Sequence, residues 1–320
     1  MSNHCLRHDH RKLGFLPQPL FCWAESPTYL FKEMGQGSFD EQKLPIICFM
    51  YFEKYFNDMI YYMNKFQIIN THSHINMLKE RTITEALQNC DSENITIIVP
   101  SYDNKSIFEV DKLVKKYPQI YGYVGVFPEE VKCFSDKTLS DMENIIKNND
   151  RIIGIGEVGL DYYWDKSFID LQKEVFIKQI DFANQMNLPL NIHCREAYFD
   201  TLNILKEYNK NSKVIMHCYS GSLDFAKECI KLGMYISIGG VVTFKNAVKV
   251  KEVAQNIPLK NLLLETDDPY LTPVPYRGKE NQPSYVKYVA QEIASLRGIT
   301  FEEVANSTTK NAKEIFPQIN

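Results

Sequence analysis

Three features are missing from this chain of 320 residues: a long apolar run, a surplus of positive charge and a regular cysteine pattern. The most apolar stretch, residues 44–63, is interrupted by Glu53, Lys54 and Asp58, whereas a transmembrane helix needs ~18 apolar residues in succession. The formal net charge of -4 argues against a bulk electrostatic grip on nucleic acid or on an anionic membrane. The eight cysteines include no CxxC pair, which favours reduced thiols in a reducing compartment over a disulfide framework.

Residues 1–65 differ in character from the rest of the chain, because they combine a polar start with loop-like and aromatic-rich stretches. The histidines and the cysteine within residues 4–10 could bind a metal, but no strand or helix pattern surrounds them, and we expect no specific site there. We interpret this region as an N-terminal extension of unknown role and residues 66–320 as the main domain. The expected location is the cytoplasm, with secretion through a recessed N-terminal signal as the alternative.

Beyond residue 65, short β-branched runs alternate with amphipathic helical patterns. Continuous apolar strands separated by helices are typical of a parallel sheet that is covered on both faces. Eight strand-helix units in about 250 residues match a (β/α)8 TIM barrel, an α/β fold whose active-site groups occupy the carboxyl ends of the strands. The predicted strands are 66–73, 94–101, 120–127, 152–158, 188–194, 213–218, 235–239 and 261–267. The predicted helices are 82–89, 107–117, 139–147, 170–186, 197–208, 223–232, 247–255, 285–297 and 301–315.

Polar side chains with metal-binding chemistry fall at the ends of these predicted strands. They are His72, His74, Glu157, His193, His217 and Asp267. His72 and His74 stand two apart on one strand, so that both imidazoles point the same way and can chelate a divalent cation. Each of these residues alone has an ordinary structural explanation, such as a hydrogen-bonded core histidine or a helix-capping acid. Gathered at one end of one fold, they predict a metal centre.

The segments NTHSHIN, GEVGLDYY, NIHCREA, MHCYSGS and ETDDPYLTPVPYRGKENQP together resemble the TatD family of metal-dependent deoxyribonucleases, within the amidohydrolase superfamily. The resemblance covers about residues 66–316 and implies hydrolysis of DNA phosphodiester bonds at one or two divalent metals. By the matching motifs, His72, His74 and Asp267 would hold one metal, and His193 and His217 the second, with Glu157 between them. The family also suggests a monomer that acts on DNA without a stable protein partner.

The chemistry of a phosphodiester agrees with this resemblance. The negative charge of a phosphodiester repels hydroxide, and its alkoxide is a poor leaving group. Two cations ~3.5–4 Å apart overcome both obstacles, because they activate a water molecule and neutralise the charge that develops on the attacking and leaving oxygens. Glu157 has two oxygens with which to bridge, and Asp267 is the candidate general base. The resemblance puts magnesium first, while the imidazole-rich ligand set leans toward zinc, with manganese also plausible.

Residues beside the predicted ligands invite further interpretation. Alternation along a strand would turn Cys194 and Cys218 away from the metals to pack in the helical layer. Arg195 could bind a phosphate or form a salt bridge with Glu196 or with another acid at the rim of the barrel. Arg277 and Lys279 lie on a loop after the last strand, and mainly by resemblance we expect phosphate binding there rather than a solvated surface. The tyrosines of GLDYY could stack on a base or pack as part of a lid.

Three positions depart from the family pattern. Asn70 and Asn76 replace acids of the first motif, and Phe127 replaces a histidine at the end of the third strand. Without the carboxylate at position 70, the orientation of His72 or His74 would weaken, a kind of change that costs ~10 to 100-fold in metal affinity or activity. Because all the proposed ligands are kept, we predict an active enzyme with an altered rate or substrate preference.

Two other interpretations stay open. One is a hydrolase of the same superfamily that acts on another ester, a lactone or an amide. The other is a non-catalytic relative that binds metal or DNA and has lost turnover through the changes at Asn70 and Phe127.

Overall fold

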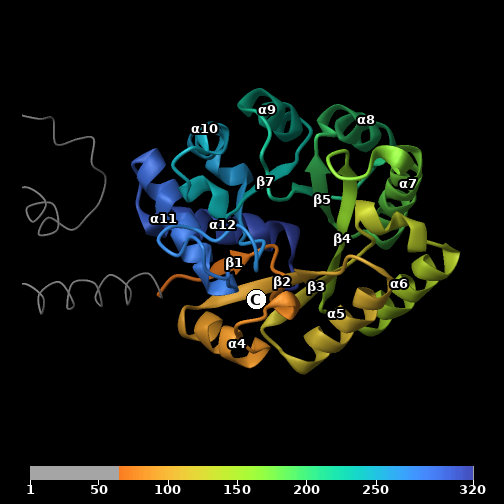
Figure 1. The fold of residues 1–320 in the computed structure, drawn as a ribbon, viewed down its shortest axis with the longest axis horizontal. Coiled ribbons are helices and arrows are strands. Elements are labelled where there is room, and N and C mark those ends of the chain that lie inside the picture. The colour runs from red at the N-terminus through yellow and green to blue at the C-terminus, as the bar shows by residue number, and fades with distance from the viewer. Residues whose placement is uncertain (1–64, 320) are drawn as a thin grey trace, which may run out of the picture.

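The computed structural model describes residues 65–319. Its strands are all parallel and close into a barrel in the order β1 to β8. Helices α4 to α12 surround the strands, as Figure 1 shows. The predicted (β/α)8 barrel is therefore confirmed. The extension and its histidine-rich start lie outside the described residues, apart from Lys65, and the boundary between the two domains stays a prediction.

The elements follow the predicted alternation of strands and helices. The strands are β1 (Ile68–Asn70), β2 (Ile95–Pro100), β3 (Ile120–Val124), β4 (Ile152–Asp161), β5 (Leu190–Arg195), β6 (Val214–Met216), β7 (Tyr235–Ile238) and β8 (Leu262–Leu264). The α-helices are α4 (Ile83–Ser92), α5 (Asn104–Lys116), α6 (Asp136–Asn148), α7 (Ile169–Met186), α8 (Tyr198–Tyr208), α9 (Leu223–Lys231), α10 (Val248–Asn256), α11 (Val286–Arg297) and α12 (Phe301–Ile315). Short 3-10 helices are η3 (Ile75–Met77), η4 (Pro128–Cys133), η5 (Lys166–Phe168), η6 (Gly240–Thr243), η7 (Leu259–Asn261) and η8 (Pro283–Tyr285).

Local sequence signals fix where several helices begin and end. Thr82 and Glu85 form a capping box at the start of α4, and Thr300 and Glu303 form one at the start of α12. Each pair satisfies backbone N–H groups that have no partner within the helix. Gly298 ends α11 in the left-handed conformation, with φ of 64°.

The floor of the barrel is apolar and closed. Side chains from alternate strand positions, among them Ile69, Ile98, Ile215 and Leu263, meet in a buried cluster that includes Phe316 from the end of the chain. A second, larger cluster fills the layer between the strands and the helices. Because the floor is packed, polar chemistry has room only at the opposite end, where the strands end and the βα loops begin.

Several strands are shorter than predicted, and the difference lies at this polar end. β1, β6 and β8 have three residues each. His72, His217 and Asp267 therefore follow their strands, because the strand ladder stops where the chain turns its side chains into the mouth. β4 is longer than predicted, and its register shifts between Ile155 and Val158, so that Glu157 lies within the strand rather than at its end.

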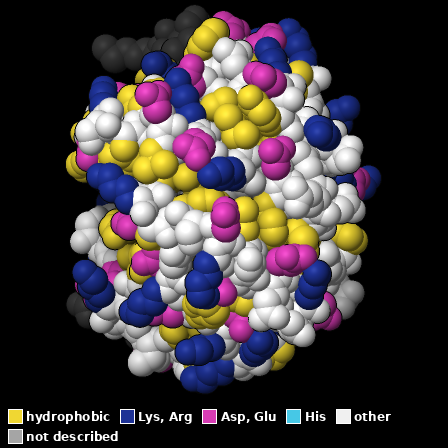
Figure 2. Space-filling view, turned by 90° about the vertical axis from the view of Figure 1, so that its right-hand side faces the viewer, with side chains coloured by type: hydrophobic (Ala, Val, Ile, Leu, Met, Phe, Trp, Pro, Cys, Tyr) yellow, Lys and Arg dark blue, Asp and Glu magenta, His cyan; other side chains and the backbone are white. Residues whose placement is uncertain are grey.

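The outer helical surface carries charges of both signs. Figure 2 shows Lys and Arg interspersed with Asp and Glu and with apolar side chains on the face that lies on the right of Figure 1. Ion pairs one turn apart run along these helices, for example Lys115 with Asp111 on α5 and Lys137 with Asp141 on α6, each at 2.7 Å. Within residues 65–319, no helix is long and apolar enough to cross a membrane.

Candidate metal centre

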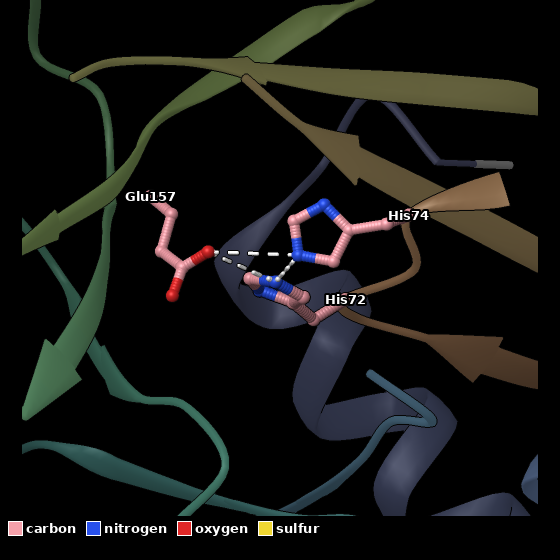
Figure 3. A group of neighbouring side chains, drawn as sticks. All are labelled: His72, His74 and Glu157. Atoms are coloured by element: carbon pink, nitrogen blue, oxygen red, sulfur yellow. Dashed lines mark hydrogen bonds and ion pairs between the residues drawn. The ribbon is translucent and has the colours of Figure 1, made fainter. Parts of the chain in front are cut away.

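One oxygen of Glu157 faces both histidines that follow β1. His72 Nε2 lies 3.5 Å and His74 Nε2 3.6 Å from Glu157 Oε2, and the two nitrogens are 3.1 Å apart (Figure 3). Asp267 Oδ1 lies 3.7 Å from His72 Nε2 and 3.6 Å from His74 Nε2. Donors bound tetrahedrally at 2.0–2.2 Å are separated by about 3.3–3.6 Å. The spacing of these atoms therefore fits a divalent cation held between them.

The other oxygen of the same carboxylate faces a second pair of imidazoles. Glu157 Oε1 lies 3.0 Å from His193 Nδ1, at the end of β5, and 3.0 Å from His217 Nε2, just after β6. Glu157 itself is buried, with 6% of its side chain exposed. The two oxygens of one carboxylate thus point to two sets of nitrogen donors, which is the arrangement that a bridging ligand between two cations requires.

Side chains behind the imidazoles fix which nitrogen faces Glu157. His72 Nδ1 donates to Asn191 Oδ1 at 2.8 Å, and His193 Nε2 donates to Asp161 Oδ2 at 2.9 Å. His217 Nδ1 lies 3.4 Å from Glu265 Oε1. Partners of this kind hold the ring and its tautomer in the orientation that a ligand needs.

The sequence interpretation missed these three supporting residues, although each carried a signal. Asn191 stands two residues before His193 and Glu265 two before Asp267, while Asp161 stands four after Glu157. An even separation on a strand puts two side chains on the same face. A polar residue at an even distance from a proposed ligand is therefore a candidate to face the same centre, although each of these three supports an imidazole from another strand: Asn191 supports His72, Asp161 supports His193 and Glu265 lies behind His217.

The electrostatics of the centre favour positive charge. Burial alone would raise the pKa of Glu157, but His217 and His72 outweigh it and hold that pKa well below its usual range. Burial would lower the pKa of His217, and the carboxylates of Glu157 and Glu265 instead raise it well above normal. The pKa of His74 is raised in the same way, against burial, by Glu157 and the acids that follow β8. The field that binds these protons also attracts a cation, and protons and cation compete for the same nitrogens.

Asn70 does not have the role expected of it. Its amide donates to Thr266 Oγ1 at 2.7 Å and to the Pro283 carbonyl at 3.2 Å, and its oxygen accepts from the backbone N–H of His72 and of Thr266. Among residues 65–319, no imidazole nitrogen is hydrogen-bonded to this side chain, which instead ties the end of β1 to the loop after β8. The contacts of residue 70 therefore do not support the expectation that a carboxylate at this position would orient the His72 or His74 ring.

The expectation for the two cysteines was right for one and wrong for the other. The Cys194 thiol contacts Thr201 and the backbone of Ala197 at the start of α8, within the helical layer. Both cysteines border the cavity above the proposed metal centre, but only the Cys218 thiol contacts a proposed ligand, Asp267. Strand alternation does not apply to Cys218 because β6 has already ended and the residue has a φ of 44°.

The cavity above the centre has a volume of about 880 Å³ and is lined mainly by the βα loops. Arg195 lines it, whereas Arg277 and Lys279 do not. Arg277 instead lies over the ring of Phe244 at 3.8 Å. Phe127 also lines the cavity, and its ring meets the His193 imidazole edge to face at 4.7 Å.

Arg195 makes no ion pair within residues 65–319, and the acid that follows it, Glu196, lies 3.8 Å from Lys166 instead. Arg195 is the single lysine or arginine among the described residues that line the cavity, and several carboxylates line the same cavity. Apart from Glu157, these carboxylates belong to Glu129, Glu130, Asp161 and Asp267.

Comparison with known proteins gives consistent matches. The family model described as TatD related DNase matches residues 69–317, from within β1 to just past α12. The uncharacterized metal-dependent hydrolase YabD of Bacillus subtilis (strain 168) is 44% identical over 252 residues, or 78% of this chain and 98% of YabD. The uncharacterized metal-dependent hydrolase YcfH of Escherichia coli (strain K12) is 34% identical over 257 residues, or 78% of this chain and 95% of YcfH. The crystal structure of YJJV, a TatD homolog from Escherichia coli K12, has a TM-score of 0.73 and 27% identity, covering 78% of this chain and 98% of YJJV.

Proposed function

The chain belongs to the TatD-related DNase family of metal-dependent hydrolases, and from this premise we propose that it hydrolyses the phosphodiester bonds of DNA. The observation that carries the proposal is the position of Glu157 between two sets of imidazoles, with each of its oxygens 3.0–3.6 Å from two ring nitrogens. Phosphodiester hydrolysis is a reaction for which a pair of cations on one carboxylate is well suited.

The proposed ligands divide between two sites. His72, His74 and Asp267 would hold one cation, His193 and His217 would hold the other, and Glu157 would contribute one oxygen to each. Divalent cations in such a centre supply Lewis-acid chemistry, because they polarise a phosphoryl oxygen and lower the pKa of water. The resemblance to deoxyribonucleases favours magnesium, while imidazole-rich ligands favour zinc or manganese.

Asp267 is our candidate general base. Its side chain is 19% exposed, against 6% for Glu157, so that it is the more accessible of the two proposed carboxylate ligands. It also lines the cavity from the loop after β8. A carboxylate in this position can accept a proton from an attacking water on the cavity side.

Arg195 is the best placed of the three residues proposed to bind phosphate. Its guanidinium lines the cavity, and a planar guanidinium can take two phosphate oxygens at once. Arg277 and Lys279, on the loop after β8, would contact only those parts of a long substrate that extend beyond the cavity.

The test is DNA hydrolysis by the purified full chain. We expect the wild type to degrade labelled DNA when magnesium, manganese or zinc is added. After EDTA treatment the wild type should degrade none, and Asp267→Asn should degrade none with any of these metals. Asp224→Asn, on α9 with 96% of its side chain exposed, is the matched control and should retain full activity. Equal degradation in all samples, or none with any metal, would refute the proposal.

A second candidate is hydrolysis of a substrate with little negative charge, such as a lactone, an amide or a neutral ester. The acids Glu129 and Glu130 in the cavity wall favour it, because they repel a phosphate backbone. Such a substrate does not need the positively charged guanidinium of Arg195 for binding. Arg195→Ala should then keep full activity on it, whereas the same variant should lose most activity on DNA if DNA is the substrate.

A further inference from the structure

An indole ring stands at the mouth of the barrel on the loop after β4. Trp164 is 62% exposed and lines the same cavity as the proposed metal ligands. Phe199, at the start of α8, is 77% exposed and does not line the cavity. An aromatic side chain that lines a polar cavity presents a flat apolar face to whatever enters the cavity, and this face can bind another flat group by stacking.

The carboxylate of Asp161 couples this ring to the metal centre. Asp161 Oδ1 accepts from the backbone N–H of Tyr163 at 2.8 Å and of Trp164 at 3.3 Å. Its other oxygen accepts from His193 Nε2 at 2.9 Å. One buried carboxylate thus fixes both the proposed ligand His193 and the backbone at the start of the loop that carries the indole, so that the fold sets where the Trp164 backbone lies relative to the centre.

Neighbouring side chains hold the indole in place. The ring of Tyr163 meets it edge to face at 4.8 Å, with an interplanar angle of 84°. The Arg195 guanidinium lies 3.8 Å from the centre of the Tyr163 ring and 5.3 Å from that of Trp164. A ring that is already positioned loses little conformational freedom when a ligand stacks on it. The same guanidinium sets positive charge beside the ring, where a phosphate linked to a flat group would lie.

We propose that Trp164 is a substrate-positioning residue that stacks on a nucleobase adjacent to the phosphodiester bond being cleaved. This inference rests on the proposed function, since it assumes that the substrate is DNA. It goes beyond that function by assigning the base-contacting group to one residue. Stacking tolerates any sequence, because every base has a flat face, so that Trp164 would position the strand without selecting among bases.

The variants that test this are Trp164→Ala, Trp164→Phe and, as a matched control, Phe199→Ala. Each is assayed on an oligothymidylate and on a series in which a single abasic residue moves along the strand. We expect Trp164→Ala to raise KM for the intact strand about tenfold with kcat nearly unchanged, a factor typical of one lost stacking contact. Trp164→Phe should recover most of this loss and Phe199→Ala should show none. With the abasic residue at one position of the strand, KM of the wild type should rise to the value that Trp164→Ala shows on the intact strand. KM of Trp164→Ala should not rise further on that abasic strand.

A binding measurement provides a readout that is independent of turnover. The chain has two tryptophans, Trp23 and Trp164, so that Trp23→Phe leaves a single fluorescent reporter at the mouth. We expect a phosphorothioate oligothymidylate to quench this fluorescence and its counterpart with the critical abasic residue not to do so.

The outcomes separate the two proposals. If the wild type cleaves DNA while Trp164→Ala has an unchanged KM, or if both oligonucleotides quench equally, the stacking proposal is overturned and the nuclease proposal stands. If the wild type cleaves none of the oligonucleotides with any metal, the nuclease proposal fails and takes the assignment of Trp164 with it.

Discussion

The two halves of the centre present similar imidazoles to Glu157 but support them differently. Behind His193 and His217 stand carboxylates, Asp161 and Glu265. Behind His72 stands a neutral amide. His74 Nδ1, like His217 Nδ1, is buried without a hydrogen-bond partner among the described residues, but a Glu265 oxygen lies 3.4 Å from His217 Nδ1.

A carboxylate behind an imidazole makes it a stronger donor, whereas an amide only orients it. The residue behind each imidazole therefore sets how strongly that imidazole binds a metal. The metal affinity of the half built on β5 and β6 should depend more on its supporting residues than that of the half that follows β1. The half that follows β1 takes its own additional anion directly, from Asp267.

The largest effect should come from removing what the halves share. Glu157→Gln takes away the one anion that faces both pairs of imidazoles, and it leaves raised-pKa histidines without their main partner. We expect both cations to be lost and kcat/KM to fall on the order of 10³-fold or more. Metal content per chain by mass spectrometry, measured with activity, checks this. Retention of one full equivalent of metal would mean that one half binds its cation independently of Glu157.

The support of one half is tested by Asp161→Asn. We expect a loss of ~10 to 100-fold in metal affinity at the His193 and His217 half, because the carboxylate behind His193 becomes a neutral amide. Asn191→Ala, at the other half, removes an amide and should cost less. Competition with a chelating dye, which reports metal affinity without turnover, gives both values. An equal loss in the two variants would contradict the distinction between the halves.

The same contrast explains what could be predicted from the sequence. Apolar runs and their alternation with helices predicted the barrel, because a strand that is buried on both faces must be apolar throughout. The supports were missed because each acts on an imidazole from another strand, as Asn191 on β5 does on His72, and contacts between strands cannot be followed along the chain. Cys218 was misplaced because strand alternation holds only while the strand ladder continues, and β6 stops two residues earlier.

The smallest effect on the centre should come from Asn70→Asp, which restores the residue type that the family pattern would place there. No imidazole of the described residues is hydrogen-bonded to the Asn70 side chain, so that we expect metal affinity and kcat/KM to change less than about threefold. Stability should fall instead, because the Pro283 carbonyl loses its donor and a buried charge replaces an amide next to Thr266. A buried polar group left without its partner costs about 1–3 kcal/mol.

Urea unfolding of the wild type and Asn70→Asp, both in the presence of EDTA, measures that cost without a contribution from bound metal. Asn306→Asp, at an exposed position of α12 outside this hydrogen-bond network, is the control and should unfold close to the wild type. A gain in metal affinity for Asn70→Asp would show that residue 70 acts on the imidazoles after all. The half that follows β1 would then have an anionic support of its own available, and the difference between the two halves would come from this one substitution rather than from the architecture of the barrel.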